Sequence, residues 1–590
     1  MRSTSLSLAF VAAALALSAP PAAAQAIYPI DRAEILSGSH FDFKVEFPGL
    51  VDPARLSVTI NGHDHAKVLG RSAELIARED GKEASSLLLR DVSLARPGTY
   101  TVKASDSASS ASVEWTVYAT PGRRAAKNVI LFIGDGFSIG HRTAARLLSK
   151  GVESGKLKGK LAMDEMPHMA LLTTQGTDSI ITDSANAAHT YTTGHKSCVN
   201  ALGVYCSRAA NSLDHPKVET LTSLAKRKGL AVGVVTNSEI EDATPAAMVA
   251  HTRRRSDYND IVRMYYDSKI DVLMGGGSPN FLPRSTAGSK RADEEDYIAK
   301  FREAGYALAT TKSEMLAAAR DAKTVKLLGL YNTGNVDGAL DLKFLKKGSV
   351  AKFPDQPDVV EEMQSAIQIL SRNRNGFVLM VESARIDKYS HSMDAERAIY
   401  DTIMLDNAVR AAQEWARANG NNTLILITAD HSHPVSVIGT VNDDAPGEEM
   451  RNKVGIYEAA GFPDYRPNGE GYPVSVDVPR RLRFIFGAYP DYYDTFHPFL
   501  DGEFVPAIKN ADGVMVANEK YRDVPGAVLR VGNLPNTGSR AANQGIHSGD
   551  DVILTAMGPG SEKVRGQMEN TELFRVIAEA LDLAGRAAGQ

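Results

Sequence analysis

The sequence predicts an α/β protein whose central, mostly parallel sheet has helices on both faces and is preceded by a small all-β sandwich. Three observations predict this fold class. Short runs of alternating apolar and polar residues fill the region 25–120. Beyond residue 127 the apolar runs become continuous, as in strands that are buried on both faces. Helical patterns separate these later runs, and strands that alternate with helices favour a parallel sheet.

The region 25–120 contains several strand-like runs that are separated by turn signals. The runs include FDFKVEF, LSVTI, SLLLRDVSL, TYTVKA and SVEWTVYA, and the turns include NGHD, EDGK and RPG. Strands this short and this closely spaced are typical of an immunoglobulin-like sandwich. The region contains no catalytic constellation. The stretch PGRRAAK at 121–127 is typical of a linker.

The region 128–590 is predicted to form the α/β domain. Its buried parallel strands are expected at NVILFIG, ALLTTQ, AVGVVTN, DVLMGG, GFVLMVE, TLILITA and DVILTAMG. The segment DAERAIYDTIMLDNAVRAAQEWARAN has helical periodicity. A segment at about 434–543 is less periodic and rich in Pro, Gly, Asp and Tyr. We interpret it as an insertion before the last strand.

Residues 1–24 have the three parts of a secretory signal peptide. Arg2 is positively charged, residues 8–17 form a short apolar run, and residues 22–24 are alanines at the cleavage position. The alternative is a membrane anchor, but the run is shorter than the ~20 residues that a spanning helix needs. No later segment is long and apolar enough to span a bilayer. We therefore expect a periplasmic or secreted chain with no transmembrane segment after cleavage.

The cysteine content bears on a possible disulfide, and the net charge bears on a possible nucleic-acid partner. Cys198 and Cys206 are the only cysteines, and outside the cytoplasm they could form a local disulfide. The alternative is two free thiols, while a zinc site lacks further Cys or His at a suitable spacing. The net charge of −5 gives no support for a nucleic-acid partner.

Acidic and histidine side chains stand at the ends of predicted strands, where open α/β sheets place their sites. Asp387 and His391 are four residues apart, so on a helix both can reach one ion. Taken alone, such a pair could be a surface ion pair, but several together favour metal binding. Aspartate with imidazole suits zinc, and carboxylate with hydroxyl and water suits magnesium. The candidates are Asp135, Glu382, Asp387, His391, Asp430, His431 and His547.

Ser184, in the segment IITDSANAAHTYTTGHK, is the candidate nucleophile. Small residues follow it, so a helix can begin there, and a helix N-terminus favours an anion such as phosphate. A serine hydroxyl needs activation, and no convincing histidine base is adjacent in sequence. Metal coordination can lower its pKa instead. The alternative is an ordinary serine at the start of a helix.

Six motifs occur in the order seen in alkaline phosphatases: GDG after a strand, TDSANAA, DATPAAMVAHTRRR, VESARIDKYSH, TADHSH and IHSGDD. The chain from about residue 128 to its C-terminus therefore resembles the whole core of that family. The resemblance implies a parallel α/β sheet and a site with two zinc ions and one magnesium ion. It also implies that phosphate monoesters are hydrolysed through a covalent phosphoserine at Ser184.

The resemblance also implies a role for each metal-ligating candidate. The first zinc would be bound by Asp387, His391 and His547. The second zinc, which also binds the Ser184 oxygen, would be bound by Asp135, Asp430 and His431. The magnesium would be bound by Asp135, Thr244 and Glu382.

Four further positions match residues that hold phosphate or orient ligands in the family. Arg255 matches the phosphate-binding arginine, whose guanidinium can grip two phosphoryl oxygens at once. The choice of Arg255 among the run Arg253–Arg255 rests on the resemblance. Asp242 and Lys388 resemble the bacterial pattern, in which the lysine could hold phosphate through water. His433 stands where the family has a histidine that orients ligands.

The expected function is that of an exported alkaline phosphatase acting on small phosphorylated substrates and releasing inorganic phosphate. A phosphodiesterase or phospholipase on the same metal site is the alternative, because related folds host several such chemistries. A sulfatase is disfavoured because its cysteine-containing motif is absent, and a non-catalytic adhesin would be expected to have lost a ligand. Asn186, His189, the insertion and the sandwich depart from the common pattern, which leaves substrate preference and assembly open. Relatives are often dimers, so a homodimer is expected.

Overall fold

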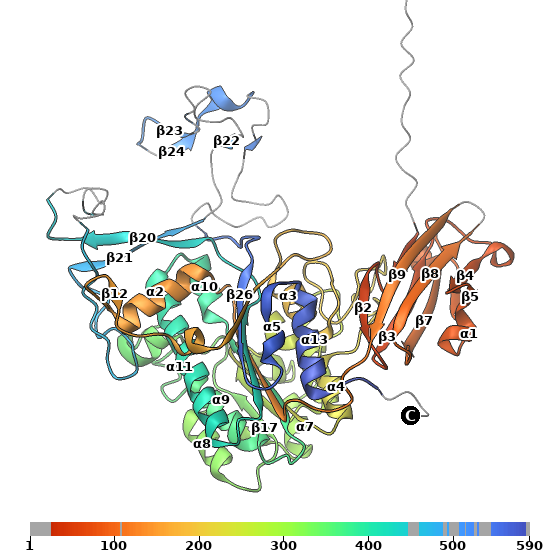
Figure 1. Ribbon diagram of the computed structural model, residues 1–590, viewed down its shortest axis with the longest axis horizontal. Coiled ribbons are helices and arrows are strands. Elements are labelled where there is room, and N and C mark those ends of the chain that lie inside the picture. The colour runs from red at the N-terminus through yellow and green to blue at the C-terminus, as the bar shows by residue number, and fades with distance from the viewer. Residues whose placement is uncertain are drawn as a thin grey trace, which may run out of the picture.

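The computed structural model describes residues 25–585 apart from nine internal gaps, and Figure 1 shows its architecture. The predicted signal peptide, residues 1–24, lies outside the described residues. In the part of the chain that is described, no helix has the length and apolar character needed to cross a membrane. The gaps are 107–108, 447–452, 454–459, 488–492, 495–504, 506, 514, 524–527 and 530–543.

The N-terminal region forms two β-sheets packed face to face, as the alternating pattern predicts. One sheet has the strand order β1-β3-β7-β6, and the other has the order β2-β9-β8-β4-β5. The inward residues of both sheets form one core around Trp115, Phe41 and Phe43, all buried. The strands are β1 (Ala26–Tyr28), β2 (Ala33–Leu36), β3 (His40–Glu46), β4 (Ser57–Ile60), β5 (His63–Asp64), β6 (Glu74–Ile76), β7 (Ser86–Ser93), β8 (Gly98–Ser105) and β9 (Ser110–Tyr118).

The rest of the described chain is built on a ten-stranded sheet with the order β16-β17-β15-β14-β18-β10-β19-β26-β13-β27. Every residue of its central strands β10, β18 and β19 is buried, because helices cover both faces. The strands are β10 (Asn128–Gly134), β13 (His168–Leu172), β14 (Ala231–Glu239), β15 (Val272–Gly276), β16 (Ala307–Ala309), β17 (Leu327–Leu330), β18 (Phe377–Ser383), β19 (Thr423–Ala429), β26 (Val552–Met557) and β27 (Arg565–Met568).

The direction of β26 differs from the sequence prediction. The run DVILTAMG is expected to be parallel like the others, but β26 pairs antiparallel with both β19 and β13. A continuous apolar run shows that a strand is buried on both faces, but it does not encode the strand's direction. The reversal places the start of β26 at the same edge of the sheet as the carboxyl ends of β10, β18 and β19.

Helices lie on both sides of the sheet, with α9 and α11 on one side and α3, α4 and α13 on the other (Figure 1). The predicted long helix is α11, which spans Ala395–Ala418 with Asp394 as its N-cap. The other helices named here are α2 (Ile139–Lys150), α3 (Ser184–Thr193), α4 (Leu221–Arg227), α9 (Val359–Leu370), α10 (Arg385–His391) and α13 (Asn570–Leu581).

The N-terminal sheets are joined to the α/β region by backbone pairing as well as by side chains. Phe41 forms an antiparallel bridge with Val218, and the Asp42 amide donates to the Lys217 carbonyl at 2.8 Å. The Lys217 amide in turn donates to the Asp42 carboxylate at 3.0 Å. The backbone of β3 therefore pairs across the interface with the α/β segment that contains Lys217 and Val218.

A buried ion network reinforces this interface. Lys44, whose side chain is 1% exposed, lies 2.9 Å from the Glu46 carboxylate and 2.7 Å from that of Glu79. From the α/β side, Arg208 Nε donates to Glu79 at 2.9 Å. Burial raises the pKa of Glu79, but Lys44 and Arg208 outweigh it and hold that pKa below its usual value. The positive charges of Lys44 and Arg208 thus offset the negative charges of Glu46 and Glu79 at a largely buried position.

The predicted insertion at about 434–543 lies only partly within the described residues. Its described part contains β20 (Val435–Asn442), which pairs antiparallel with β21 (Arg480–Phe486). The Gly487 amide donates to the Pro434 carbonyl, and the Ile546 amide donates to the Gly487 carbonyl. Ser432 and Ser548 also form an antiparallel bridge. Both ends of the segment are therefore held together beside the sheet.

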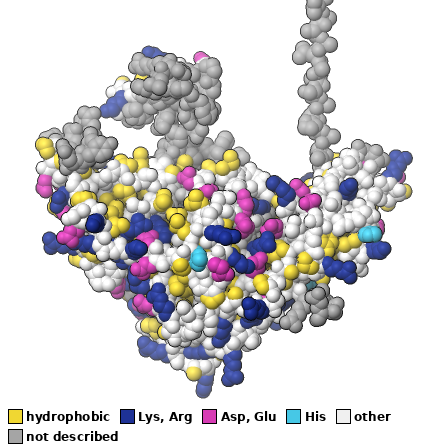
Figure 2. Space-filling view, viewed as in Figure 1, with side chains coloured by type: hydrophobic (Ala, Val, Ile, Leu, Met, Phe, Trp, Pro, Cys, Tyr) yellow, Lys and Arg dark blue, Asp and Glu magenta, His cyan; other side chains and the backbone are white. Residues whose placement is uncertain are grey.

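Positive and negative side chains are interspersed over the face of the molecule seen in Figure 2. That distribution agrees with the small net charge of −5 and shows no large single-sign field on this face.

Candidate metal and phosphate site

The predicted site residues gather at one edge of the central sheet. Asp135 follows β10 directly, Glu382 lies near the end of β18, and Asp430 follows β19 directly. His547 comes before β26 rather than after a strand, and the reversed direction of β26 brings it to the same edge. The carboxyl ends of β10, β18 and β19 and the start of the antiparallel strand β26 therefore bring candidate ligands to one edge of the sheet.

One group of ligands surrounds the carboxylate of Asp387, which α10 presents. Asp387 Oδ1 lies 2.7 Å from His433 Nε2, 3.2 Å from His391 Nε2 and 3.4 Å from His547 Nε2. The spacing of four residues between Asp387 and His391 places both on one face of α10. His391 Nδ1 is 2.8 Å from the Gly545 carbonyl oxygen, which orients its ring.

His547 is held in the same way as His391. Its Nδ1 lies 2.9 Å from the Thr182 carbonyl oxygen, which leaves Nε2 directed at the Asp387 group. A backbone carbonyl on one ring nitrogen fixes the tautomer that leaves the other nitrogen free for a metal. The ligand atoms of Asp387, His431, His433 and His547 all lie within 4.8 Å of one another.

The second group consists of Asp135, Asp430 and His431, whose ligand atoms also lie within 4.8 Å of one another. His431 Nε2 is 3.3 Å from a carboxylate oxygen of each aspartate. Asp430 Oδ1 accepts hydrogen bonds from the Gly136 and His431 amides, whereas its buried Oδ2 has no hydrogen-bond partner. A buried carboxylate oxygen without such a partner fits a metal ligand.

Thr244 and Glu382 are the remaining predicted metal ligands. The hydroxyl of Thr244 is buried and has no hydrogen-bond partner, which fits a metal ligand. Thr236, which the sequence analysis did not single out, donates a hydrogen bond to Glu382. Thr236 lies on β14, next to β18, so its role depends on strand pairing and gives no motif in the sequence.

The electrostatics of Asp135, Asp430 and Glu382 favour a bound cation. Burial, and next the Asp430, Asp387 and Glu382 carboxylates, raise the pKa of Asp135 well above its usual range. Burial, and next Asp387, also raise the pKa of Asp430. Burial raises the pKa of Glu382 to about 8. Such crowding of buried carboxylates is costly unless positive charge compensates it.

Ser184 is the first residue of α3 and lies beside the second group. Its Oγ is 3.4 Å from Asp135 Oδ1 and 3.4 Å from His431 Nε2. Asp183 caps the helix, because its carboxylate accepts a hydrogen bond from the Asn186 amide. His431 thus lies next to the hydroxyl, although 247 residues separate the two in sequence.

Arg255 is held between two carboxylates, one of which belongs to Asp183, the residue before Ser184. Its Nη1 lies 3.1 Å from Asp183 and its Nη2 lies 2.8 Å from Asp242. The other oxygen of Asp242 lies 2.7 Å from Lys388 Nζ. Burial raises the pKa of Asp242, but the Lys388 and Arg255 charges outweigh it and hold that pKa far below its usual range. Asp183 is the member of this cluster that sequence reasoning missed, although its place before Ser184 is a helix-capping signal.

The two departures from the common pattern on α3 anchor the loop that follows it. The Asn186 side chain donates to the Ser197 carbonyl, and the Gly203 amide donates to His189 Nδ1 at 2.8 Å. Within that loop Cys198 and Cys206 form a disulfide, the first of the two alternatives for these cysteines. These side chains of α3 therefore hold the loop that also contacts Arg255, whose amide donates to the Asn200 carbonyl.

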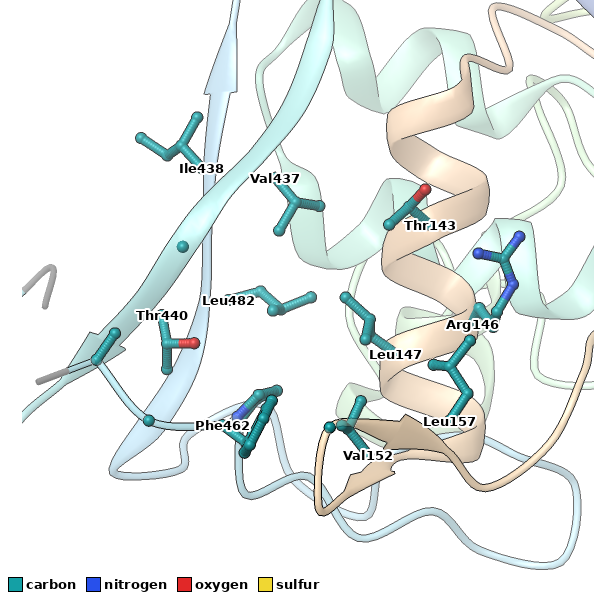
Figure 3. A pocket seen from close by; sticks show the side chains of 15 residues that line it. Thr143, Arg146, Leu147, Val152, Leu157, Val437, Ile438, Thr440, Phe462 and Leu482 are labelled. Atoms are coloured by element: carbon teal, nitrogen blue, oxygen red, sulfur yellow. The ribbon is translucent and has the colours of Figure 1, made fainter. Parts of the chain in front are cut away.

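A separate apolar pocket of about 700 Å³ lies between α2 and the β20–β21 ribbon (Figure 3). Leu147 and Val437 point into it from opposite sides, and Phe462 lines one end. None of its lining residues belongs to the metal groups or to the Arg255 cluster.

Comparisons with known proteins agree with this geometry. The alkaline phosphatase family profile matches residues 126–583. The chain is 34% identical to Escherichia coli alkaline phosphatase over 359 residues, which cover 55% of this chain and 73% of that one. It is 30% identical to Bacillus subtilis alkaline phosphatase 3 over 463 residues, which cover 77% and 89% of the two chains.

Solved structures support the same fold. The crystal structure of Thermus thermophilus alkaline phosphatase matches with a TM-score of 0.54 and 23% identity, covering 79% of this chain and 93% of that one. The alkaline phosphatase of the Antarctic bacterium TAB5 matches with a TM-score of 0.51 and 22% identity, covering 78% and 98%. With the profile spanning well over half of its length, the chain belongs to the alkaline phosphatase family, whose members are phosphomonoester hydrolases.

Proposed function

We propose that this phosphatase is exported, forms a covalent phosphoserine at Ser184, and uses two zinc ions and one magnesium ion. One observation supports this most strongly: Ser184 Oγ lies at the start of α3, 3.4 Å from ligand atoms of both Asp135 and His431. The hydroxyl is thus placed where a helix N-terminus and a metal ligand group meet.

The metal-binding roles follow from the two ligand groups. Asp387, His391 and His547 would hold the first zinc, and the 2.7 Å contact from His433 to Asp387 would orient that carboxylate. Asp135, Asp430 and His431 would hold the second zinc. Asp135, Thr244 and Glu382 would hold the magnesium, with the buried Thr244 hydroxyl as a ligand that lacks any other partner. Bound metals supply charge stabilisation for the attacking and leaving oxygens and make water a stronger nucleophile.

The chain's own groups position the phosphoryl group for attack. A guanidinium has five N–H donors, and among the described residues carboxylates accept from two of those of Arg255. The remaining donors can bind two phosphoryl oxygens, which fixes the phosphorus in front of Ser184 Oγ. The carboxylates of Asp183 and Asp242 keep the guanidinium in this position before the substrate arrives. Lys388, paired with Asp242, adds positive charge that can reach phosphate through water.

Attack by Ser184 Oγ on phosphorus forms the Ser–O–P bond and expels the alcohol, and hydrolysis of that bond then returns the serine and inorganic phosphate. Export would follow cleavage of the signal peptide after Ala24, and the Cys198–Cys206 disulfide agrees with an oxidising compartment. The partners would be small phosphorylated molecules and a second copy of the chain. The expected mature N-terminus, Gln25, can be checked by mass spectrometry of the exported protein.

The test of this function compares a monoester with its matched diester. The mature protein, reconstituted with zinc and magnesium, is assayed with p-nitrophenyl phosphate and with bis(p-nitrophenyl) phosphate. We expect kcat/KM to favour the monoester by about 100-fold or more, which corresponds to about 2.7 kcal/mol. A preference for the diester would overturn the proposed monoesterase and move the function to a phosphodiesterase.

A further inference from the structure

A second basic pocket lies directly beside the phosphate-binding arginine. It has a volume of about 520 Å³ and includes Arg255 in its wall. No lining residue is acidic. The pocket is formed by two segments, 200–215 and 253–256. Besides Arg255, its polar lining includes Asn200, Ser207, Ser212, His215, Arg253 and Arg254.

The arginines of this pocket differ in how their charge is compensated. Arg255 is paired with two carboxylates, whereas Arg253 Nη1 donates to a neutral acceptor, the Val199 carbonyl, at 2.9 Å. Arg254 is exposed, and within the described chain its guanidinium has no ion pair or hydrogen bond. Two neighbouring guanidinium groups without a carboxylate partner create a positive field in a concave surface.

Asp257, the first acidic residue after Arg253 and Arg254 in the sequence, forms hydrogen bonds with hydroxyl groups and, within the described chain, not with these arginines. One carboxylate oxygen of Asp257 accepts hydrogen bonds from Ser212 Oγ and Thr252 Oγ1, both at 2.6 Å. No ion pair joins Asp257 to Arg253 or Arg254 among the residues that the structure describes. The Arg254 donors, and the Arg253 donors other than the one that Val199 accepts, therefore remain available to an anion from outside the protein.

The walls of the pocket are fixed in place. The Arg253 amide donates to the Ser212 carbonyl at 2.8 Å, which joins the two segments. The Ser207 amide donates to His215 Nδ1 at 3.1 Å, so the neutral imidazole has its proton on Nε2. In the same segment, Arg208 donates to Glu79, which lies between β6 and β7, and the Cys198–Cys206 disulfide closes the preceding loop. A site that is rigid before binding loses less entropy when a ligand arrives.

We propose that this pocket binds a second anionic group of the substrate, a carboxylate or a further phosphate on the alcohol that leaves. The inference rests on the proposed monoesterase and deepens it, since it names the substrate class. Arg255 contributes to both the phosphate site and the pocket, so one molecule can reach Ser184 with its phosphate and Arg254 with its second anion. Guanidinium groups suit this task, because their planar donors match carboxylate and phosphate oxygens.

The experiment uses two open-chain substrates that differ only at C1, which is a carboxylate in 6-phosphogluconate and a hydroxymethyl group in sorbitol 6-phosphate. The readout is the ratio of their kcat/KM values on the mature, metal-loaded protein. For the unmodified protein we expect a preference of about tenfold for 6-phosphogluconate, the size of one charge-assisted contact. The Arg254→Gln variant should lower the ratio to about 2 or less, while Arg254→Lys should retain part of it because the charge remains.

The control is Arg320→Gln, an exposed arginine at the end of helix α8 (Lys312–Arg320), which should leave the ratio unchanged. A ratio near 1 in the unmodified protein, or one that Arg254→Gln leaves intact, would overturn the proposed pocket. That result is distinct from failure of the proposed function, which would appear as absent hydrolysis of both substrates. Raising the salt concentration should shrink the preference for 6-phosphogluconate, because exposed charges are screened.

Discussion

Arg255 Nη1 lies 3.1 Å from Asp183 Oδ2, and the other oxygen of the same carboxylate caps the helix that begins at Ser184. One side chain therefore sets both the position of the proposed nucleophile and the direction of the arginine that would hold its target. A second carboxylate, Asp242, holds the far side of the same guanidinium. The proposed phosphate site is thus organised by the protein before a substrate binds.

Replacing Arg255 by lysine should weaken phosphate binding more than it slows turnover. Lysine keeps the charge but loses the planar fork that spans both carboxylates and two phosphoryl oxygens. We expect kcat/KM for p-nitrophenyl phosphate to fall about 10- to 100-fold, mainly through KM, and inhibition by inorganic phosphate to weaken in parallel. The Arg320→Lys variant serves as the matched control. Unchanged inhibition by phosphate would exclude Arg255 from the phosphate site.

Ser184→Ala should abolish the covalent intermediate. Removing Oγ leaves no oxygen to form the Ser–O–P bond, while the ligands Asp135 and His431 remain. Rapid acid quenching after mixing with labelled substrate measures the phosphoenzyme, and elemental analysis checks that zinc is retained. A stoichiometric phosphoenzyme in this variant would mean that another residue is the nucleophile.

Asp387→Ala should release one zinc ion per chain. The Asp387 carboxylate is the centre of a group of three histidines, so its loss removes a ligand and the partner that orients the others. Elemental analysis after dialysis should show about one equivalent less zinc than in the unmodified protein. The exposed Asp550, three residues after His547, supplies the control Asp550→Asn. Full zinc content in Asp387→Ala would contradict the assignment.

Lys44→Met should destabilise the protein through the interface of the N-terminal sheets. The substitution leaves Glu46 and Glu79 buried with fewer cations around them, and breaking a buried ion network costs about 3–5 kcal/mol. We expect the thermal midpoint to fall by several degrees in differential scanning calorimetry. Arg78→Met, which removes an exposed ion pair with Glu83, should change it little. Equal midpoints for the two variants would show that the network contributes nothing.

Acid should destabilise the loop region around His189, whose buried imidazole is neutral. Burial lowers the pKa of His189 to about 3, below the value of 6.5 for an unfolded chain. Between these values the unfolded chain binds one more proton, so this contribution to stability is complete above about pH 6.5 and is lost as the pH falls. His189→Asn, which keeps an acceptor for the Gly203 amide, should reduce the slope of unfolding free energy against pH by about 1.4 kcal/mol per pH unit. The free energy of unfolding is measured in urea at several pH values in this range. An equal change with pH in both proteins would contradict the prediction.

Most strands, and the edge of the sheet at which the candidate ligands gather, could be predicted from sequence because their signals are local. NVILFIG and GFVLMVE become β10 and β18, buried along their whole length, and the polar residues that end them reach one edge of the sheet. The spacing of Asp387 and His391 was sufficient to place both on one helical face. These features depend on neighbouring residues, which a sequence displays directly.

The remaining features depend on contacts between distant residues. The direction of β26 is set by its neighbours β19 and β13, so the apolar run alone could not give it. The short strands β16, at the edge of the sheet, and β17, beside it, contain too few residues for a periodic signal. Lys44 and Arg208 are 164 positions apart, and only packing of the N-terminal sheets against the α/β region brings them into one ion network.

The bridge between Ser432 and Ser548 has a consequence for how relatives of this chain can diverge. It joins the two stems of a connection that leaves the sheet after His431 and returns at His547. Because the entropic cost of closing a loop grows only slowly with its length, residues can be gained or lost between the stems at little cost to the scaffold. The chemistry can therefore stay constant over evolutionary time while the surface above it changes.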